Sequence, residues 1–138
     1  MDLRDEPTWV VVELTRAGDV KAAEGKLDAL LRRDLGVGPD FPIFIPYALF
    51  SKGGRKVSIR LVDGYVFLGS DLPEVRYFRL ESLPFVESIL STRSGRGMRV
   101  LQTIPNSHVE ELRERLRREL SVSIEEGSNV RVVRGNYA

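Results

Sequence analysis

The stretch TWVVVELTRAGDVKAAEGKL (residues 8–27) contains the pattern that decides the fold class. Residues 9–14 are β-branched and almost continuously apolar, which is typical of a strand covered on both faces or lying at a sheet centre. Beyond Gly18, apolar residues recur at helical spacing until Gly36, and Asp19 is suited to cap the start of that helix. The stretch predicts a central strand followed by one amphipathic helix that packs on it.

Strand-like runs follow at residues 41–50, 56–62 and 65–68. Two prolines within the first run would each remove a donor from a strand ladder, which predicts an edge strand or a partly irregular segment. Gly53-Gly54 indicates a turn between the first and second runs. Asp63-Gly64 is typical of a type I′ hairpin turn between the second and third.

The second half of the chain alternates helical and extended patterns. Asp71 and Glu74 have the spacing of a capping box at a second helix start, and residues 85–90 predict a further strand. The stretch STRSGRGMR (91–99) predicts a solvated, mobile loop. A last helix is then expected from the apolar spacing of Val109, Leu112, Leu116 and Leu120.

These elements predict an α+β fold. The order is strand, helix, two or three strands, helix, strand, helix, and then a detached alternating strand at the end of the chain. Such an order favours a mainly antiparallel, RNP-like sheet with helices packed on one face. The other face of such a sheet would be left to water or to a partner.

Composition excludes several functional classes. The chain has 138 residues, room for one domain with a short appendage, and its net charge of +1 gives no global attraction to nucleic acid or lipid. It has no cysteine, hence no disulfide, thiolate nucleophile or cysteine-based zinc site. Without an apolar leader or an apolar stretch long enough to span a membrane, a cytoplasmic protein is expected.

Catalytic motifs are not apparent in the sequence. The one histidine, His108, is expected in the first turn of a helix, where a solvated side chain is the commoner role. The glycines near residue 96 lack the spacing of a phosphate-binding loop, and paired acids such as Glu110-Glu111 fit a helix start. We therefore expect no catalytic residues, no metal and no cofactor, and we favour a binding function.

Three blocks of the chain resemble, in order, the N-terminal (NGN) domain of NusG-type transcription factors and the start of their KOW module. Residues 8–27 are similar to the opening strand and helix of that domain. DGYVFLGSDLPEVRYFRLESLPFVESIL (63–90) is similar to its most recognisable block, with Gly-Tyr-Val after a turn and Pro-x-Val before the last strand. EEGSNVRVVRGNYA (125–138) resembles the KOW opening. The chain departs from the family pattern at Val10, often Tyr, and at Asp63, usually Pro.

The resemblance implies a non-enzymatic transcription elongation or antitermination factor, either the general factor or a specialised paralogue. In that family an apolar patch of the NGN domain docks on the clamp helices of the largest RNA polymerase subunit. A second segment touches the gate loop of the opposite pincer, and the non-template DNA strand is a further contact. The result is that transcriptional pausing is suppressed without any chemistry.

Carried over position by position, the resemblance assigns three groups of residues. The clamp-facing patch would consist of Trp9, Val10, Leu61, Val62 and Tyr65. The gate-loop side would consist of Arg76, Tyr77 and Phe78. Thr15 and Arg16 match a loop that approaches non-template DNA, where an arginine binds phosphate or stacks on an unpaired base. Each of these residues also has a purely structural interpretation, as a core, sheet or solvated position.

The resemblance also predicts the domain organisation. Residues 1–121 would form the NGN-like domain, and residues 122–138 a linker and the start of a KOW-like module. Because a complete KOW module needs several more strands, a fragment of a longer factor is expected, whose KOW module would recruit further partners. The alternatives are a factor that lost this module, and a last strand that pairs elsewhere.

Two other functions are compatible with the residues. A stand-alone module of RNP-like fold that binds single-stranded nucleic acid would use sheet aromatics and the basic loop containing Arg93, Arg96 and Arg99. A small-molecule regulatory or enzymatic domain would require a concave pocket with convergent polar groups, which the sequence does not indicate.

Overall fold

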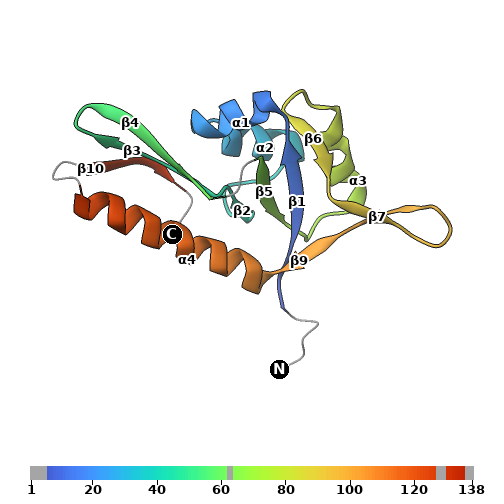
Figure 1. Ribbon diagram of the computed structural model, residues 1–138. Coiled ribbons are helices and arrows are strands. Elements are labelled where there is room, and N and C mark those ends of the chain that lie inside the picture. Colours follow the sequence, from blue (N-terminus) through green and yellow to red (C-terminus); the bar gives the residue numbers. More distant parts are fainter. Residues whose placement is uncertain (1–5, 62–63, 127–129, 136–138) are drawn as a thin grey trace.

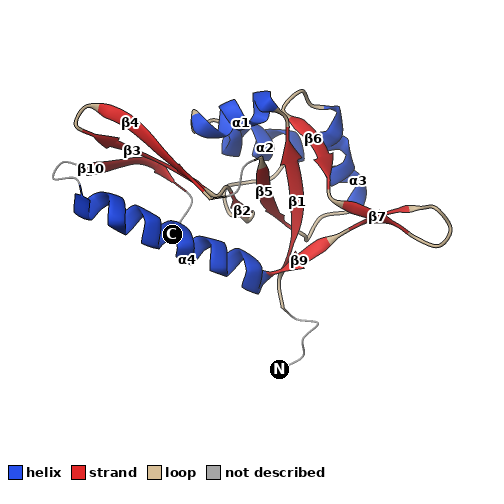
Figure 2. Cartoon of the chain, viewed as in Figure 1, coloured by secondary structure: helices blue, strands red, loops and turns tan. Residues whose placement is uncertain are grey.

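The computed structural model describes residues 6–61, 64–126 and 130–135 (Figure 1). Every strand pairing within these residues is antiparallel, which confirms the predicted α+β class with a mainly antiparallel sheet (Figure 2). The central sheet has the order β2-β5-β1-β6, with β9 also pairing with β1. Its strands are β1 (Thr8–Leu14), β2 (Ile43–Phe44), β5 (Tyr65–Gly69), β6 (Val86–Ile89) and β9 (Thr103–Pro105).

Two smaller sheets and four α-helices complete the described chain. The second sheet has the order β10-β3-β4, and the third pairs β7 with β8. Their strands are β3 (Tyr47–Lys52), β4 (Arg55–Arg60), β10 (Val130–Gly135), β7 (Ser91–Arg93) and β8 (Arg99–Leu101). The helices are α1 (Arg16–Ala23), α2 (Leu27–Leu35), α3 (Glu74–Phe78), which continues into a 3-10 turn (Arg79–Ser82), and α4 (Asn106–Glu126).

Strand β1 lies at the centre of the sheet, as its continuous apolar run predicts. It pairs with β5 on one side, from Trp9↔Gly69 to Glu13↔Tyr65, and with β6 and β9 on the other. Because side chains alternate along a strand, its apolar residues divide between two cores. Val10, Val12 and Leu14 face one core, whereas Trp9 and Val11 face the other.

Helices cover both faces of the central sheet, so the prediction that they pack on one face is wrong. The core that contains Val10 receives side chains from α1, α2 and the segment after α3. The core that contains Trp9 receives Val109 and Leu116 from α4. Figure 1 shows α4 crossing the molecule on the side away from α1 and α2. The inner face predicted for α4 is correct, but the sequence did not indicate which sheet face it would cover.

The single helix predicted between Asp19 and Gly36 is two helices. The chain enters α1 earlier than expected, because the Thr15 hydroxyl accepts a hydrogen bond from the Gly18 amide (3.2 Å) and acts as the N-cap. Gly25, with a φ of 73°, then interrupts the helix, and α2 ends at Gly36 as predicted.

Strands β4 and β5 do not form the hairpin that Asp63-Gly64 predicted, because they belong to different sheets. Gly64 has a φ of 77°, and its carbonyl accepts a hydrogen bond from the Leu14 amide (2.7 Å). Asp63 lies outside the described residues. The Gly64 carbonyl therefore ties the residue before β5 to the end of β1. The Gly53-Gly54 turn joins β3 to β4 as predicted.

Four further predictions differ from the structure, one of them only in part. Pro73, not Asp71, precedes α3, and it makes no side-chain cap. The predicted loop at residues 91–99 is correct only for residues 94–98, which form an exposed turn, because residues 91–93 and 99 belong to the strands of the β7–β8 hairpin. The last strand is not detached, because β10 pairs with β3. Helix α4 also continues to Glu126, beyond the expected start of a linker at residue 122. The division into an NGN-like domain and the start of a KOW-like module stays a prediction.

A polar cluster joins the second sheet to α1. The hydroxyl of Tyr47, which is 3% exposed, donates to the Asp19 carboxylate. Arg60 forms an ion pair with the other Asp19 oxygen (3.0 Å), and its guanidinium lies 5.1 Å from the centre of the Tyr47 ring. Burial, and then the hydrogen bond to Asp19, raise the pKa of the Tyr47 hydroxyl to about 12. The protonated phenol is therefore the form that the folded state favours.

This shift predicts a loss of stability at alkaline pH. Because the folded-state pKa lies above the unfolded value of 10.0, Tyr47 contributes its full stabilisation below pH 10 and loses it as pH rises towards 12. Raising the pH to about 11 should therefore lower the unfolding free energy of the wild type by about 1 kcal/mol more than that of Tyr47→Phe, because phenylalanine has no hydroxyl to ionise. Urea unfolding of both proteins at about pH 9 and about pH 11 measures this difference. Equal pH dependence in the two proteins would contradict it.

Candidate protein-docking surface

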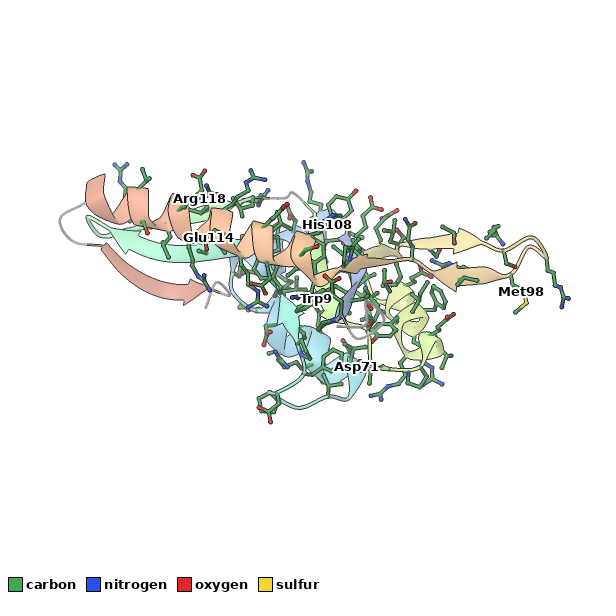
Figure 3. All side chains as sticks on the ribbon, turned by 90° about the horizontal axis from the view of Figure 1, so that it is seen from below. Trp9, Asp71, Met98, His108, Glu114 and Arg118 are labelled. Carbon is green, nitrogen blue, oxygen red and sulfur yellow. The ribbon has the colours of Figure 1, made fainter. Side chains whose placement is uncertain are left out.

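A group of buried apolar residues, which we call the Trp9 cluster, lies between the central sheet and α4. It consists of Trp9, Val11, Phe44, Ala48, Phe67, Val109 and Leu116. The indole nitrogen of Trp9 donates to the side-chain oxygen of Asn106, the first residue of α4 (2.9 Å). The Arg113 guanidinium lies 5.8 Å from the Trp9 ring centre and 5.1 Å from that of Phe44. In Figure 3, Trp9 lies beside the N-terminal part of α4. These contacts hold α4 on the sheet.

Accessible apolar side chains lie next to the Trp9 cluster. The partly buried residues Ile59, Leu61, Ile104 and Leu112 pack directly against it. Tyr65 lies two residues before Phe67 on β5, so both point to the same face, and Tyr65 is 37% exposed. Leu90, 36% exposed, follows the Val12↔Ile89 pair and therefore lies opposite Val11 on this face. We call this set, Ile59, Leu61, Tyr65, Leu90, Ile104 and Leu112, the apolar rim.

Polar groups border the rim at the end of β1. Glu13 pairs with Tyr65 on β5 and with Ser88 on β6, so the three side chains form one row across the sheet. The Ser88 hydroxyl donates to the Glu13 carboxylate (3.0 Å). An apolar surface with a polar border of this kind is typical of a protein-docking site.

The structure separates the five residues expected to face the clamp. Leu61 and Tyr65 belong to the apolar rim, whereas Trp9 is 5% exposed and lies beneath α4. Val10 is fully buried in the core on the opposite face of the sheet. Val62 lies outside the described residues. Of the described four, therefore, only Leu61 and Tyr65 present side chains to solvent on one surface.

The three residues expected at the gate loop make contacts within the protein. The Arg76 guanidinium donates to the carbonyls of Leu35 and Gly36 at the end of α2. Tyr77 is fully buried; its hydroxyl donates to the Gly69 carbonyl (2.5 Å), and burial raises its pKa. Phe78 lies beneath the Arg99 guanidinium, 4.3 Å from the ring centre. The outward residues of this segment are Glu74, Val75, which is 54% exposed, and Arg79.

The two residues expected to approach DNA lie at the start of α1, not in a loop. The Thr15 hydroxyl, besides capping the helix, donates to the Pro84 carbonyl (2.8 Å). Arg16 is the first residue of the helix, and its side chain is exposed. Thr15 is thus engaged within the fold, whereas Arg16 extends into solvent.

The described residues contain no cluster of His, Asp and Glu side chains that would hold a metal ion. His108 is exposed in the first turn of α4, which is where the sequence predicts it (Figure 3). No helix within the described residues is both long and apolar enough to cross a membrane.

Sequence reasoning missed four members of the apolar rim: Ile59, Leu90, Ile104 and Leu112. They come from β4, the end of β6, β9 and α4, so their proximity depends on the tertiary arrangement. The apolar spacing of α4 placed Leu112 on the inner face of that helix, but it did not indicate that this face packs on the Trp9 cluster, against which Leu61 also packs. A single apolar residue at a strand end, such as Leu90, carries no sequence signal of its own.

The antiparallel sheet and its helices define an α+β domain, and its apolar rim is typical of a surface that binds another protein. Comparison with known proteins finds a transcription termination/antitermination protein NusG from Campylobacter jejuni that is 30% identical over 135 residues, covering 94% of this chain and 75% of that protein. No family model and no solved structure matches the chain. The chain belongs to the NusG family, and it is a non-enzymatic transcription elongation or antitermination factor of that family.

Proposed function

We propose that this protein binds RNA polymerase by docking its apolar rim on the clamp helices of the largest subunit, and that it suppresses pausing in the cytoplasm. The observation that carries the proposal is the position of Leu61 and Tyr65, which lie accessible on the face that contains the Trp9 cluster. Membership of the NusG family supports the same class of partner. The tip of a helical hairpin suits this surface, because a helix docks through a few apolar side chains spaced along one face.

Within this proposal, Trp9 and Val10 act as supports rather than as contacts. Trp9 packs beneath the rim and fixes α4 through Asn106, and Val10 fixes β1 against the opposite core. A rigid base lowers the entropy lost when rim side chains are immobilised by a partner. Substitution of either residue should therefore affect folding before it affects binding.

We propose that the α3 segment faces the gate loop of the opposite pincer. Arg76, Tyr77 and Phe78 hold this segment in place through their internal contacts. The exposed Val75 and Arg79 are then the side chains available for contact. A factor that touches both pincers favours the closed clamp, because its binding free energy is fully realised only in that conformation. No catalytic step is needed.

Non-template DNA is a further proposed contact. Arg16 extends into solvent from the first turn of α1, where a guanidinium can reach a phosphate or stack on an unpaired base. Thr15 would fix the backbone at this point through its cap and its bond to Pro84.

The alternative function, an RNP-like module that stacks bases on its sheet, has less support. Three aromatic side chains on the relevant face are buried, and they belong to Trp9, Phe44 and Phe67. Among the side chains that the structure describes, Tyr65, at 37%, is the only aromatic one that is exposed rather than partly or fully buried. Successive stacked bases would need several exposed rings.

Capture of the isolated clamp helices tests the docking proposal. Leu61→Asp should weaken binding by roughly tenfold or more, because it places a charge at the centre of an apolar contact, and Tyr65→Ala should weaken it several-fold. Binding is measured by titration of labelled clamp helices with each variant. The control is Val20→Ala, which removes a comparably exposed apolar side chain (51%) from α1.

A thermal melt of each variant separates lost binding from lost folding. Leu61 is partly buried, so Tyr65→Ala, at a more exposed position, is the decisive variant if Leu61→Asp unfolds. Equal affinity of the wild type, Tyr65→Ala and the Val20→Ala control would show that the rim is not the docking site.

A further inference from the structure

We propose that the β7–β8 hairpin is an arm that binds the phosphodiester backbone of nucleic acid. This inference does not depend on the clamp-docking surface, because it concerns a different part of the molecule and a direct contact made by the chain alone. In Figures 1 and 3 the hairpin projects from the body, and Met98 lies near its far end.

The tip of the arm is ordered by its own hydrogen bonds. The two strands pair from Ser91↔Leu101 to Arg93↔Arg99. Beyond them, the Ser94 amide donates to the Met98 carbonyl (2.7 Å) and the Gly97 amide donates to the Ser94 carbonyl (2.8 Å). The Ser94 hydroxyl also accepts from the Met98 amide (3.2 Å). The arm therefore presents its tip in a defined conformation, which reduces the ordering cost of binding.

The paired part of the arm is fixed to the body through Arg99, which is the cross-strand partner of Arg93. Its guanidinium donates to both oxygens of the Glu81 carboxylate and to the Ile89 carbonyl (3.0 Å), and it covers the Phe78 ring. The Glu81 carboxylate also accepts from the Ile89 amide (2.8 Å). The paired Arg99 guanidinium holds the pKa of Glu81 below its usual value. Arg99 is thus a structural anchor, and it does not belong to the basic surface that the sequence suggested.

The charge of the arm points to a polyanion. The chain carries no Asp or Glu between residues 88 and 109, although the whole protein is nearly neutral. Arg93 and Arg96 are exposed near the tip, and the Arg93 guanidinium donates to the Gly97 carbonyl (3.1 Å), which keeps it beside the turn. Two guanidinium groups without a neighbouring carboxylate on the arm are suited to phosphate oxygens.

An apolar side chain at the tip favours nucleic acid over an acidic peptide. Met98 is 66% exposed and lies next to the arginines. A nucleic acid offers sugar and base surfaces directly beside its phosphates, and exposed apolar side chains of DNA-binding arms contact or wedge between these groups. An acidic peptide, in contrast, need not carry an apolar group next to its charged groups.

Fluorescence titration of the complete chain against labelled duplex DNA, single-stranded DNA and single-stranded RNA tests the proposal. The variant Arg93→Gln/Arg96→Gln should bind more weakly, and its plot of log affinity against log salt should be less steep by about 2. Met98→Ala should weaken binding without changing that slope. The control Arg115→Gln/Arg118→Gln removes the same charge from exposed positions on α4. The three probes show which form of nucleic acid is preferred.

Three results would overturn the proposal. The first is an absence of wild-type binding to all three probes at low salt. The second is an equal loss of affinity in the arm variant and in the control variant, which would indicate net charge rather than a site. The third is competition by polyglutamate as effective as competition by unlabelled DNA, which would indicate an acidic protein partner. A thermal melt identical to that of the wild type is expected for the arm variant, because both arginines are exposed.

Discussion

Replacing Gly18 by alanine should lower the free energy of unfolding by about 3 kcal/mol, the upper end of typical overpacking costs. Gly18 lies in the first turn of α1, where the helix meets the segment before β6. A Cβ at this position would stand 2.1 Å from the Phe85 carbonyl oxygen and 3.1 Å from the Leu14 Cβ. The same carbonyl accepts a hydrogen bond from the Thr15 amide (3.2 Å), so the backbone cannot move away without losing that bond.

The expected change in unfolding free energy has the opposite sign to the change that helix propensity alone would cause. Alanine is favoured over glycine inside a helix by about 1 kcal/mol, so a destabilised variant would reveal the close approach of α1 and not a local preference. Urea denaturation provides the measurement. Gly38→Ala is the control, because a Cβ there meets nothing within 4 Å. If Gly18→Ala were as stable as Gly38→Ala, α1 would not lie against Phe85 as described.

Replacing Leu116 by alanine should cost about 3 kcal/mol of unfolding free energy, within the range for buried leucine truncations. Leu116 is fully buried in the Trp9 cluster, where α4 packs on the sheet. Truncation leaves a cavity beside aromatic rings that are held by other contacts and cannot collapse fully into it. The loss of unfolding free energy in Leu116→Ala measures how much the packing of α4 on the central sheet contributes to stability.

The matched control lies six residues further along the same helix. Val122 is 53% exposed, so Val122→Ala should change the free energy of unfolding by less than about 0.5 kcal/mol. Both variants are compared by urea denaturation. If Leu116→Ala had an effect as small as Val122→Ala, α4 would not be packed on the sheet, and the apolar rim would have to be defined again without Leu112.

The local sequence pattern was sufficient to predict elements whose conformation depends mainly on their own residues. The β-branched run of β1, the paired glycines between β3 and β4, and the apolar spacing of α4 each predicted an element that the structure contains. The local sequence pattern failed where contacts with a segment distant in sequence decide the conformation. Thr15 begins α1 before Asp19, and α1 packs on the Phe85 carbonyl because Gly18 permits the approach. No local signal distinguishes that glycine from a helix breaker.

The candidate site was predictable only in part for the same reason. Leu61 and Tyr65 were predicted by resemblance and lie accessible on one face. Trp9 was predicted as a contact but lies beneath α4, because the sequence does not state which face of the sheet that helix covers. Exposure is a property of the packed elements, and a pattern in one strand cannot supply it.

The sequence by itself determined most of the helices and strands, the antiparallel α+β class and the NusG resemblance, because these depend on the order and spacing of residues along the chain. The tertiary structure alone decided that helices cover both faces, that β4 and β5 belong to different sheets, and that residues 91–99 extend as an arm. It also decided that Arg99 anchors this arm whereas Arg93 and Arg96 face solvent. The physical reason is that such choices depend on contacts between residues distant in sequence, whose free energies appear only once the elements pack.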